Sequence, residues 1–143
     1  MGWRTNGNFG TSGMTENRFV LDTNAVIFLT TKGNMIHPDL QDELNEADLF
    51  VSVISEIELF AKKELPPDEE ENLRALLSDR ITVIDLTNDI KKETIALRRN
   101  NKLKLPDCIV AATAVVLNAV LLTNDTELLR LAWPGYIPRS PNG

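Results

Sequence analysis

Cysteine and histidine, which many catalytic and metal-binding sites need, are almost missing from this sequence. There is one cysteine, Cys108, and one histidine, His37, in 143 residues. A single thiol excludes a disulfide within the chain, which fits a reducing compartment. A zinc site and a Ser–His hydrolase both need residues that this chain lacks, so neither class is expected. We expect Cys108 to be a small core residue and His37, directly before Pro38, to cap a helix.

Glycine-rich phosphate loops and long hydrophobic runs are absent as well. No GxGxxG motif occurs, and no GxxxxGK followed by Ser or Thr. The longest apolar stretch, residues 108–122, is shorter than the about 20 residues of a membrane-spanning helix. The N-terminus has no apolar segment typical of a secretory signal. We therefore expect a cytoplasmic protein that does not bind a membrane.

The remaining composition is typical of one globular domain. The chain is 43% hydrophobic and 25% charged, with a net charge of −6, and its length suits a single core. Because the overall field repels nucleic acid, binding it would need a local basic patch or a metal ion. We expect the domain over residues 18–138, after a disordered N-terminal extension at 1–17 and before a tail at 139–143. The extension is rich in Gly, Asn, Thr and Ser.

Short apolar runs alternate with helical patterns along the domain. Strands are expected at 18–21, 49–53, 81–84 and 119–122, with an edge strand at 136–137. Helices are expected at 25–30, from 38, at 54–63, from 68, from 87 or 88, at about 106–118 and at 126–132. The strands are continuous apolar runs, as in a parallel sheet covered on both faces. This alternation predicts a three-layer α/β/α fold with a central parallel sheet of four or five strands.

One carboxylate opens the most apolar helix of the chain. Asp107 is the only charged residue between Leu105 and Asn124. Pro106 suits the first turn of a helix, and a helix that is apolar all round lies in a core. A carboxylate in apolar surroundings is costly unless something pairs with it. Asp107 therefore calls for a partner elsewhere in the chain.

Further acids follow two of the predicted strands. Asp22 ends the first strand, and Asp125 follows the fourth. In an open parallel sheet, ligands bind beyond the carboxyl ends of the strands, and Asp107 precedes the fourth strand closely enough to share that edge. Glu56 and Glu58 lie in the helix after the second strand. Spacing favours Glu58 only weakly, because it borders an expected apolar stripe of Ile54, Ile57 and Ala61.

Each of these acids also has a simpler explanation. Asp22, Asp107 and Asp125 all lie near helix starts, where acids cap helices and favour the dipole. Asn124 and Glu127 resemble a capping box. As a group, however, acids gathered at one edge repel each other and need protons or a cation. Carboxylates without His or Cys suit Mg²⁺ or Mn²⁺.

Four motifs, in order, resemble the PIN-domain family. They are FVLDTN at 19–24, VSVISEIEL at 51–59, LPDCIVAATA at 105–114 and LTND at 122–125. Members of this family are metal-dependent ribonucleases, and small single-domain members are often VapC-type toxins that are held inactive by an antitoxin and are commonly homodimers. The resemblance implies Asp22, Glu58, Asp107 and Asp125 as the catalytic acids and selects Glu58 over Glu56.

The resemblance also implies how the reaction works. Mg²⁺ or Mn²⁺ held by Asp22, Asp107 and Asp125 would promote hydrolysis of an RNA phosphodiester, with Glu58 as a ligand or water-positioning group. Asn24 and Thr123 are candidates to orient those carboxylates. Four cations just before Asp107 would contact the RNA backbone, or would simply be a solvated helix end. They are Arg98, Arg99, Lys102 and Lys104.

Two other interpretations remain. A phosphoacceptor receiver domain also has a parallel sheet and an acidic pocket, and Asp85 follows the third strand as an acceptor would. Such a domain normally has paired acids after its first strand and a late Lys, whereas Asp22 stands alone and no Lys follows Lys104. A binding module that has lost catalytic activity is disfavoured, because all four acids are present.

Overall fold

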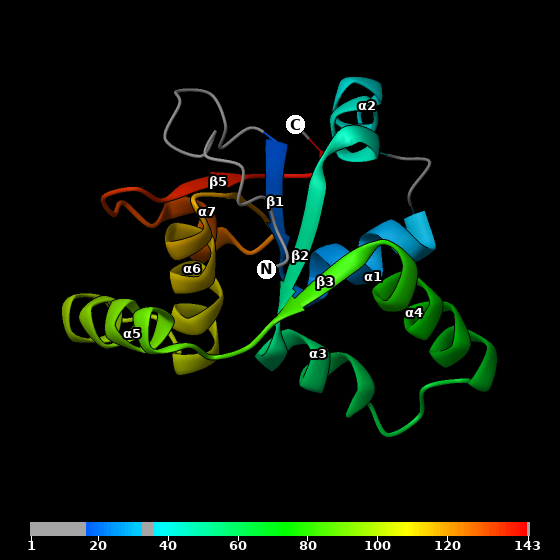
Figure 1. The fold of residues 1–143 in the computed structure, drawn as a ribbon, viewed down its shortest axis with the longest axis horizontal. Coiled ribbons are helices and arrows are strands. Elements are labelled where there is room, and N and C mark those ends of the chain that lie inside the picture. Colours follow the sequence, from blue (N-terminus) through cyan, green and yellow to red (C-terminus); the bar gives the residue numbers. More distant parts are fainter. Residues whose placement is uncertain (1–16, 33–35, 143) are drawn as a thin grey trace.

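The computed structural model describes residues 17–32 and 36–142, so nearly all of the expected N-terminal extension lies outside the described residues. Five strands form one sheet in the order β3-β2-β1-β4-β5, and every pair of neighbours is parallel (Figure 1). The strands are β1 Arg18–Leu21, β2 Asp48–Ser52, β3 Ile81–Ile84, β4 Val120–Leu122 and β5 Ile137–Arg139. The predicted parallel sheet is confirmed, with five strands.

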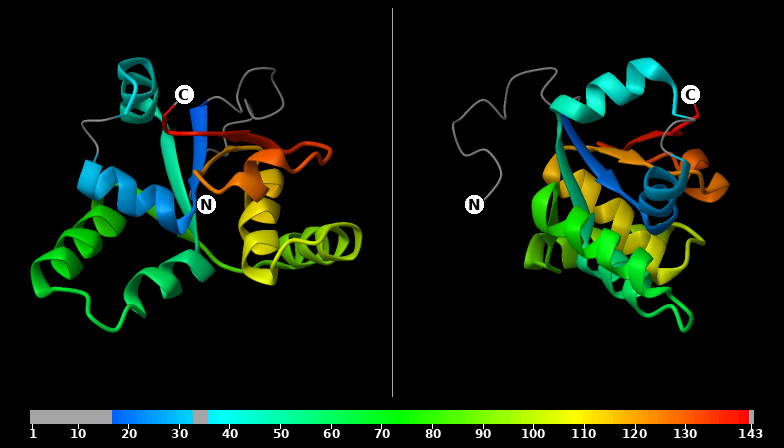
Figure 2. Two further views of the ribbon diagram at one scale, coloured as in Figure 1. Left: turned by 180° about the vertical axis from the view of Figure 1, so that it is seen from behind. Right: turned by 90° about the vertical axis from the view of Figure 1, so that its right-hand side faces the viewer.

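Helices cover both faces of this sheet (Figures 1 and 2). They are α1 Thr23–Lys32, α2 Pro38–Glu46, α3 Val53–Phe60, α4 Pro67–Asp79, α5 Asn88–Asn100, α6 Leu105–Leu117 and α7 Thr126–Arg130. Side chains of α1, α2 and α4 share one apolar cluster with the sheet, and those of α5, α6 and α7 share the other. The fold is therefore the expected three-layer α/β/α arrangement.

The central strand β1 explains why the two clusters form. Phe19 and Leu21 point into the cluster that contains α1, and Val20 between them points into the cluster that contains α6. All three side chains are fully buried, because side chains alternate along a strand and both faces are covered. Burying one such side chain contributes about 1.5–3 kcal/mol. The three apolar residues of β1 therefore contribute to the apolar clusters on both faces of the sheet.

Most element boundaries agree with the sequence analysis. β1 and β3 have the predicted bounds. Thr87 caps α5, and the buried residues of this helix are Ile90, Thr94 and Leu97. α1 begins at Thr23, two residues before the prediction, because Asp22 caps its first turn. β5 runs to Arg139, one residue into the expected tail.

Helix α3 differs most from the prediction. It ends at Phe60 instead of residue 63, and its buried residues are Ser55 and Leu59. Ile57 is 56% exposed and Ala61 is also exposed, so the expected Ile54, Ile57 and Ala61 stripe is wrong. The buried face was hidden in the sequence because serine counts as polar in an apolar pattern, although Ser55 is small enough for full burial.

Helix α6 is the buried helix expected at the centre of the chain. Cys108 is fully buried within it, and burial raises the pKa of this thiol, as expected for a core residue. The helix ends at Asn118, whose φ of 57° and ψ of 47° are left-handed. No helix in the part of the chain that the structure describes is long and apolar enough to cross a membrane.

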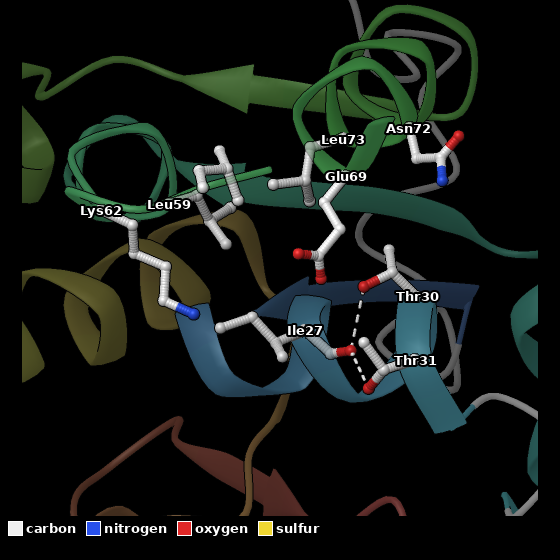
Figure 3. Close-up of a pocket in the computed structure, with 9 residues that line it drawn as sticks. Ile27, Thr30, Thr31, Leu59, Lys62, Glu69, Asn72 and Leu73 are labelled. Atoms are coloured by element: carbon white, nitrogen blue, oxygen red, sulfur yellow. Dashed lines mark hydrogen bonds between the residues drawn. The ribbon is translucent and has the colours of Figure 1, made fainter. Parts of the chain in front are cut away.

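A small pocket remains where α1, α3 and α4 meet (Figure 3). Its volume is about 80 Å³, and Ile27, Leu59 and Leu73 contribute apolar walls. The Thr30 and Thr31 hydroxyls beside it both donate to the Ile27 carbonyl, at 2.9 and 2.8 Å. None of the four predicted catalytic acids lines this pocket.

Candidate active site

The candidate site lies at the point where the strand order of the sheet reverses, between β1 and β4. From β1 the chain adds β2 and then β3 on one side, whereas β4 and β5 lie on the other side. Crevices at such switch points, beyond the carboxyl ends of the strands, are where open α/β sheets bind ligands. β1 and β4 pair with Leu21 opposite Leu122. The residues that follow, Asp22 and Thr123, therefore lie side by side.

The Asp22 carboxylate is held by hydrogen bonds from two sides, from α1 and from the residue that follows β4. Its Oδ1 accepts a hydrogen bond from the Ala25 amide at 2.7 Å, which caps α1. Its Oδ2 accepts one from the Thr123 hydroxyl. The side chain is buried, with 6% exposed. Asp22 is therefore both a helix cap and a fixed carboxylate at the end of the central strand.

Asp125 joins the same network through Thr123. The Asp125 amide donates to Thr123 Oγ1 at 3.0 Å, so that one hydroxyl connects the two acids. Asp125 Oδ1 caps α7 by accepting from the Glu127 and Leu128 amides at 2.8 and 3.1 Å. The expected capping box at Asn124 is wrong, because Asn124 Oδ1 instead accepts from the Ser140 hydroxyl at 3.2 Å.

Asp107 is the third residue of α6 and is half-buried. Lys104, the N-cap residue, makes no side-chain cap to this helix. Among the described residues, none donates a hydrogen bond to the Asp107 carboxylate. The capping explanation therefore fits Asp22 and Asp125 but not Asp107, whose only helical contribution is its charge near the N-terminus.

Glu58 reaches the same place from α3. Its Oε1 accepts a hydrogen bond from the Thr23 hydroxyl at 2.7 Å. Glu56, two residues earlier on the same helix, does not line the cleft that contains Glu58. Residues two apart point to different sides of a helix, and the side that carries Glu58 faces the other acids.

The four acids line one open cleft of about 250 Å³. The full lining is Asp22, Thr23, Asn24, Glu58, Pro106, Asp107, Val110 and Asp125. Asn24, expected from the sequence, is exposed there. Thr23, Pro106 and Val110 were not singled out beforehand. Pro106 and Val110 flank Asp107 at i−1 and i+3, and this helical spacing is the signal that would have found them.

Burial and mutual repulsion change the acidity of two of these groups. Desolvation is the main reason why the pKa of Asp22 is raised above 3.8, with Asp125 and Glu58 adding repulsion, although the Thr123 and Ala25 hydrogen bonds oppose it. Desolvation also raises the pKa of Asp107, and nearby Asp125 raises it further, whereas Lys104 lowers it. The cleft is therefore short of positive charge.

The donor set suits a divalent cation in kind. All the candidate ligands are carboxylate oxygens, which hard cations such as Mg²⁺ and Mn²⁺ prefer. In the described part of the chain, however, no three His, Cys, Asp or Glu side chains stand close enough to hold a metal ion together. Both oxygens of Asp22 and one oxygen each of Glu58 and Asp125 accept hydrogen bonds within the protein. Side chains must therefore turn before the four acids act as one ligand set.

The four predicted RNA-binding cations lie from the last turn of α5 to the start of α6. Arg98 and Arg99 occupy the last turn of α5, and Lys104 is the N-cap residue of α6. All four, including Lys102, are exposed. Arg98 also donates to the Leu103 carbonyl at 3.0 Å and so braces the loop that leads to Asp107.

The sheet order does not favour the receiver interpretation. A receiver-like sheet has the order 2-1-3-4-5, with its third strand inside, whereas β3 is an edge strand here. Asp85 follows β3, and β2 separates it from β1. Asp85 does not line the acidic cleft.

Several proteins of known structure have a fold similar to that of this chain. None of the curated proteins matches the chain, but several solved structures do. A chain of a toxin–antitoxin complex from Klebsiella pneumoniae is 30% identical, with 82% of this chain and 94% of that chain covered and a TM-score of 0.63. VapBC2 from Rickettsia felis, bound to a DNA fragment from its promoter, is 22% identical with a TM-score of 0.68, and 86% and 98% are covered. DNA-bound VapBC from Salmonella typhimurium is 24% identical with a TM-score of 0.63, and 86% and 97% are covered.

The family profile for the PIN domain matches residues 19–134, which include all four acids, the helices α1 to α7, the strands β2 to β4 and all of β1 except its first residue. The sequence motifs, the switch point and the acidic cleft lie within that match. The chain belongs to the PIN domain family.

Proposed function

We propose that this protein is a Mg²⁺- or Mn²⁺-dependent endoribonuclease and that the acidic cleft is its active site. PIN domains are nucleases, so the family supports hydrolysis of a phosphodiester. The observation that carries the proposal is the convergence of Asp22, Glu58, Asp107 and Asp125 on one cleft at the switch point of the sheet. Burial, and repulsion from neighbouring acids, raise the pKa of Asp22 and of Asp107, and a cation in the cleft would offset that repulsion.

The four acids have two kinds of role in this proposal. Asp22, Asp107 and Asp125 hold the metal, and Glu58 binds it or orients the attacking water. Thr123 and Asn24 orient the carboxylates, since ligating carboxylates need hydrogen-bonding partners. A bound divalent cation would supply Lewis acidity for activating water and for offsetting charge on the phosphate oxygens. Among the described residues that line the cleft, none is Ser, Cys or His.

Arg98, Arg99, Lys102 and Lys104 bring the RNA backbone to the cleft. The net charge of −6 repels a polyanion, so local cations are needed to hold phosphates. These four are exposed and lie along the connection that leads into Asp107. Lys104 is also close enough to Asp107 to lower the pKa of its carboxyl.

The partner of this nuclease is an antitoxin. The 30% identical chain comes from a toxin–antitoxin complex and is covered over 94% of its length, which supports a toxin role for this chain. We further propose a homodimer and a cytoplasmic location, where RNA and an antitoxin would both be met. Light scattering of the purified chain, alone and with its antitoxin, measures both assemblies.

The test is cleavage of single-stranded RNA by the purified chain with Mg²⁺, with Mn²⁺ and with a chelator. Glu58→Gln should lower kcat by about a hundredfold, the usual scale for a positioned catalytic group. Glu56→Gln is the matched control, because it makes the same change on the same helix outside the cleft. It should stay within about threefold of wild type.

Two results would overturn the proposal. One is cleavage that continues at the full rate in the chelator. The other is a Glu56→Gln variant that is inactive beside a Glu58→Gln variant that is normal, since the active site would then lie on another side of α3.

A further inference from the structure

We infer that Thr23 is a positioning residue that holds Glu58 in the active-site cleft. The inference rests on the proposed nuclease function and adds a residue that the four motif acids leave out. Thr23 Oγ1 donates to Glu58 Oε1 at 2.7 Å, across 35 residues of sequence. This hydrogen bond connects the start of α1 to the side of α3 that faces the cleft.

The position of Thr23 explains why its hydroxyl is free for this contact. Threonines inside helices usually donate to a carbonyl of the preceding turn. Thr31, Thr94 and Thr113 do so here, to carbonyls four residues earlier. Thr23 is the first residue of α1 and has no preceding turn. Asp22 already caps the helix through the Ala25 amide, so Thr23 is not needed as a cap either.

Glu58 needs such a partner more than the other acids do. Asp22 and Asp125 are fixed by backbone amides, and Asp107 has a short side chain that is half-buried on α6. Glu58 is exposed and has a long side chain. Among the described residues, Thr23 is the only hydrogen-bond donor to its carboxylate. Repulsion from Asp22, whose pKa Glu58 helps to raise, would otherwise favour rotamers that point into solvent.

The bond also selects which oxygen of Glu58 is available. Oε1 is engaged by Thr23, while Oε2 has no donor among the described residues and can act in the cleft. The partial positive charge at the N-terminus of α1 favours a carboxylate at the same place. Thr23 therefore sets both the direction and the usable oxygen of Glu58 without touching the substrate itself.

The test replaces the hydroxyl and keeps the shape. Thr23→Val should lower kcat about tenfold, the scale of a partly exposed hydrogen bond to a charged group, and should leave KM within about twofold. Thr23→Ser should restore most of the activity. Thr126→Val is the matched control, because Thr126 is also the first residue of a helix, is exposed and lies outside the cleft.

A double-mutant cycle separates positioning from a general structural effect. Adding Thr23→Val to Glu58→Ala should lower kcat no further, because the partner is already missing. If the two losses multiply instead, Thr23 acts independently of Glu58 and the inference is wrong.

A measurement without substrate or metal tests the bond itself. In protein labelled with ¹³C at glutamate carboxyls, the Glu58 resonance is identified by its loss in Glu58→Ala. It should shift in Thr23→Val and stay in place in Thr126→Val. An unmoved resonance refutes the inference even if the wild type cleaves no RNA. Wild-type inactivity with a shifted resonance would overturn the nuclease proposal and leave the Thr23–Glu58 contact standing.

Discussion

At the scale of single residues, two opposing effects act on Asp22: its hydrogen bonds stabilise the carboxylate, and its burial destabilises it. Its hydrogen bonds to Ala25 and Thr123 favour the ionised form, but burial outweighs them and raises the pKa above 3.8. A carboxyl with a raised folded pKa binds protons more tightly in the folded state than in the unfolded state. In metal-free protein its contribution to stability therefore falls as the pH rises from about 3.8 through the folded pKa.

Asp22→Asn should remove metal-dependent RNA cleavage without unfolding the protein. Asparagine can still accept from the Ala25 amide, and it carries no charge that must be desolvated. At pH 7 the metal-free variant should melt no lower than the wild type. Its advantage should shrink as the pH falls toward 3.8, because the wild-type carboxyl then becomes protonated. Calorimetry between pH 4 and pH 8 follows both effects.

Asp85→Asn is the control for this substitution. Asp85 is exposed and follows an edge strand, so RNA cleavage should remain within about twofold of wild type. A drop of several degrees in the melting temperature of metal-free Asp22→Asn would mean that the hydrogen bonds of the charged carboxylate to Ala25 and Thr123 stabilise the fold by more than its desolvation costs.

At the scale of helices and strands, the ends of the elements are fixed by local chemistry. α6 ends on Asn118 in a left-handed conformation, from which the chain enters β4 two residues later. Asn and Gly tolerate that conformation, whereas a β-branched residue does not. This short connection sets the register of the strand that carries Thr123 and Asp125.

Asn118→Val should therefore reduce the free energy of unfolding by about 1–2 kcal/mol relative to Asn118→Gly. Urea denaturation of the two variants measures the difference directly. Asn118→Gly also removes any side-chain interaction of Asn118, so comparing the two variants isolates the backbone effect. Equal stabilities would show that the connection can relax out of the left-handed region.

The elements that the sequence predicted well are those in which the residues at buried positions are apolar and recur at the spacing of a strand or a helix. In β1, the three apolar residues Phe19, Val20 and Leu21 follow Arg18 without interruption. In α5, Thr87 caps a helix whose apolar face has helical spacing. α3 was predicted poorly because its buried face contains a serine and its exposed face contains Ile57. Burial there follows from what packs on α3, and the pattern of one segment does not contain that information.

The site was partly predictable for the same reason. Acids after strands and at a helix start could be placed on one edge from the chain alone. Spacing alone could not choose between Glu58 and Glu56, because the choice depends on which side of α3 faces the cleft. The resemblance of the motif at 51–59 selected Glu58, which lines the cleft. The Thr23–Glu58 hydrogen bond lay beyond reach as well, since it joins two helices that no local pattern relates.

At the scale of the whole molecule, the fold brings four carboxylates into one cleft without enough positive charge to balance them. β1, α3, α6 and the segment after β4 each deliver one acid to the cleft. Two of these acids have raised pKa values that reflect burial and repulsion. A ligand of opposite charge that binds only the folded cleft should therefore stabilise the entire domain.

Mg²⁺ or Mn²⁺ should raise the melting temperature of the wild type. Free metal at 100 times its dissociation constant adds about 2.7 kcal/mol, which corresponds to roughly 10 °C for a domain of this size. Asp107→Asn should reduce this shift while leaving the metal-free melting temperature no lower than that of the wild type, because Asp107 caps nothing and burial disfavours its ionised form. Melting curves that stay superimposed at millimolar metal in the wild type would contradict a cation site in the cleft.

The Thr123 hydroxyl that bonds Asp22 joins residues 101 positions apart, and this has a consequence for synthesis of the chain. A ribosome delivers Asp22 early, but the partner strand β4 and Asp125 emerge only after most of the domain has been made. Parallel pairing of β1 with β4 therefore waits for that late segment. Every nascent chain therefore passes through a long stage in which Asp22 and Glu58 have been made but the cleft has not formed, so the proposed nuclease activity would begin only after β4 and Asp125 have emerged.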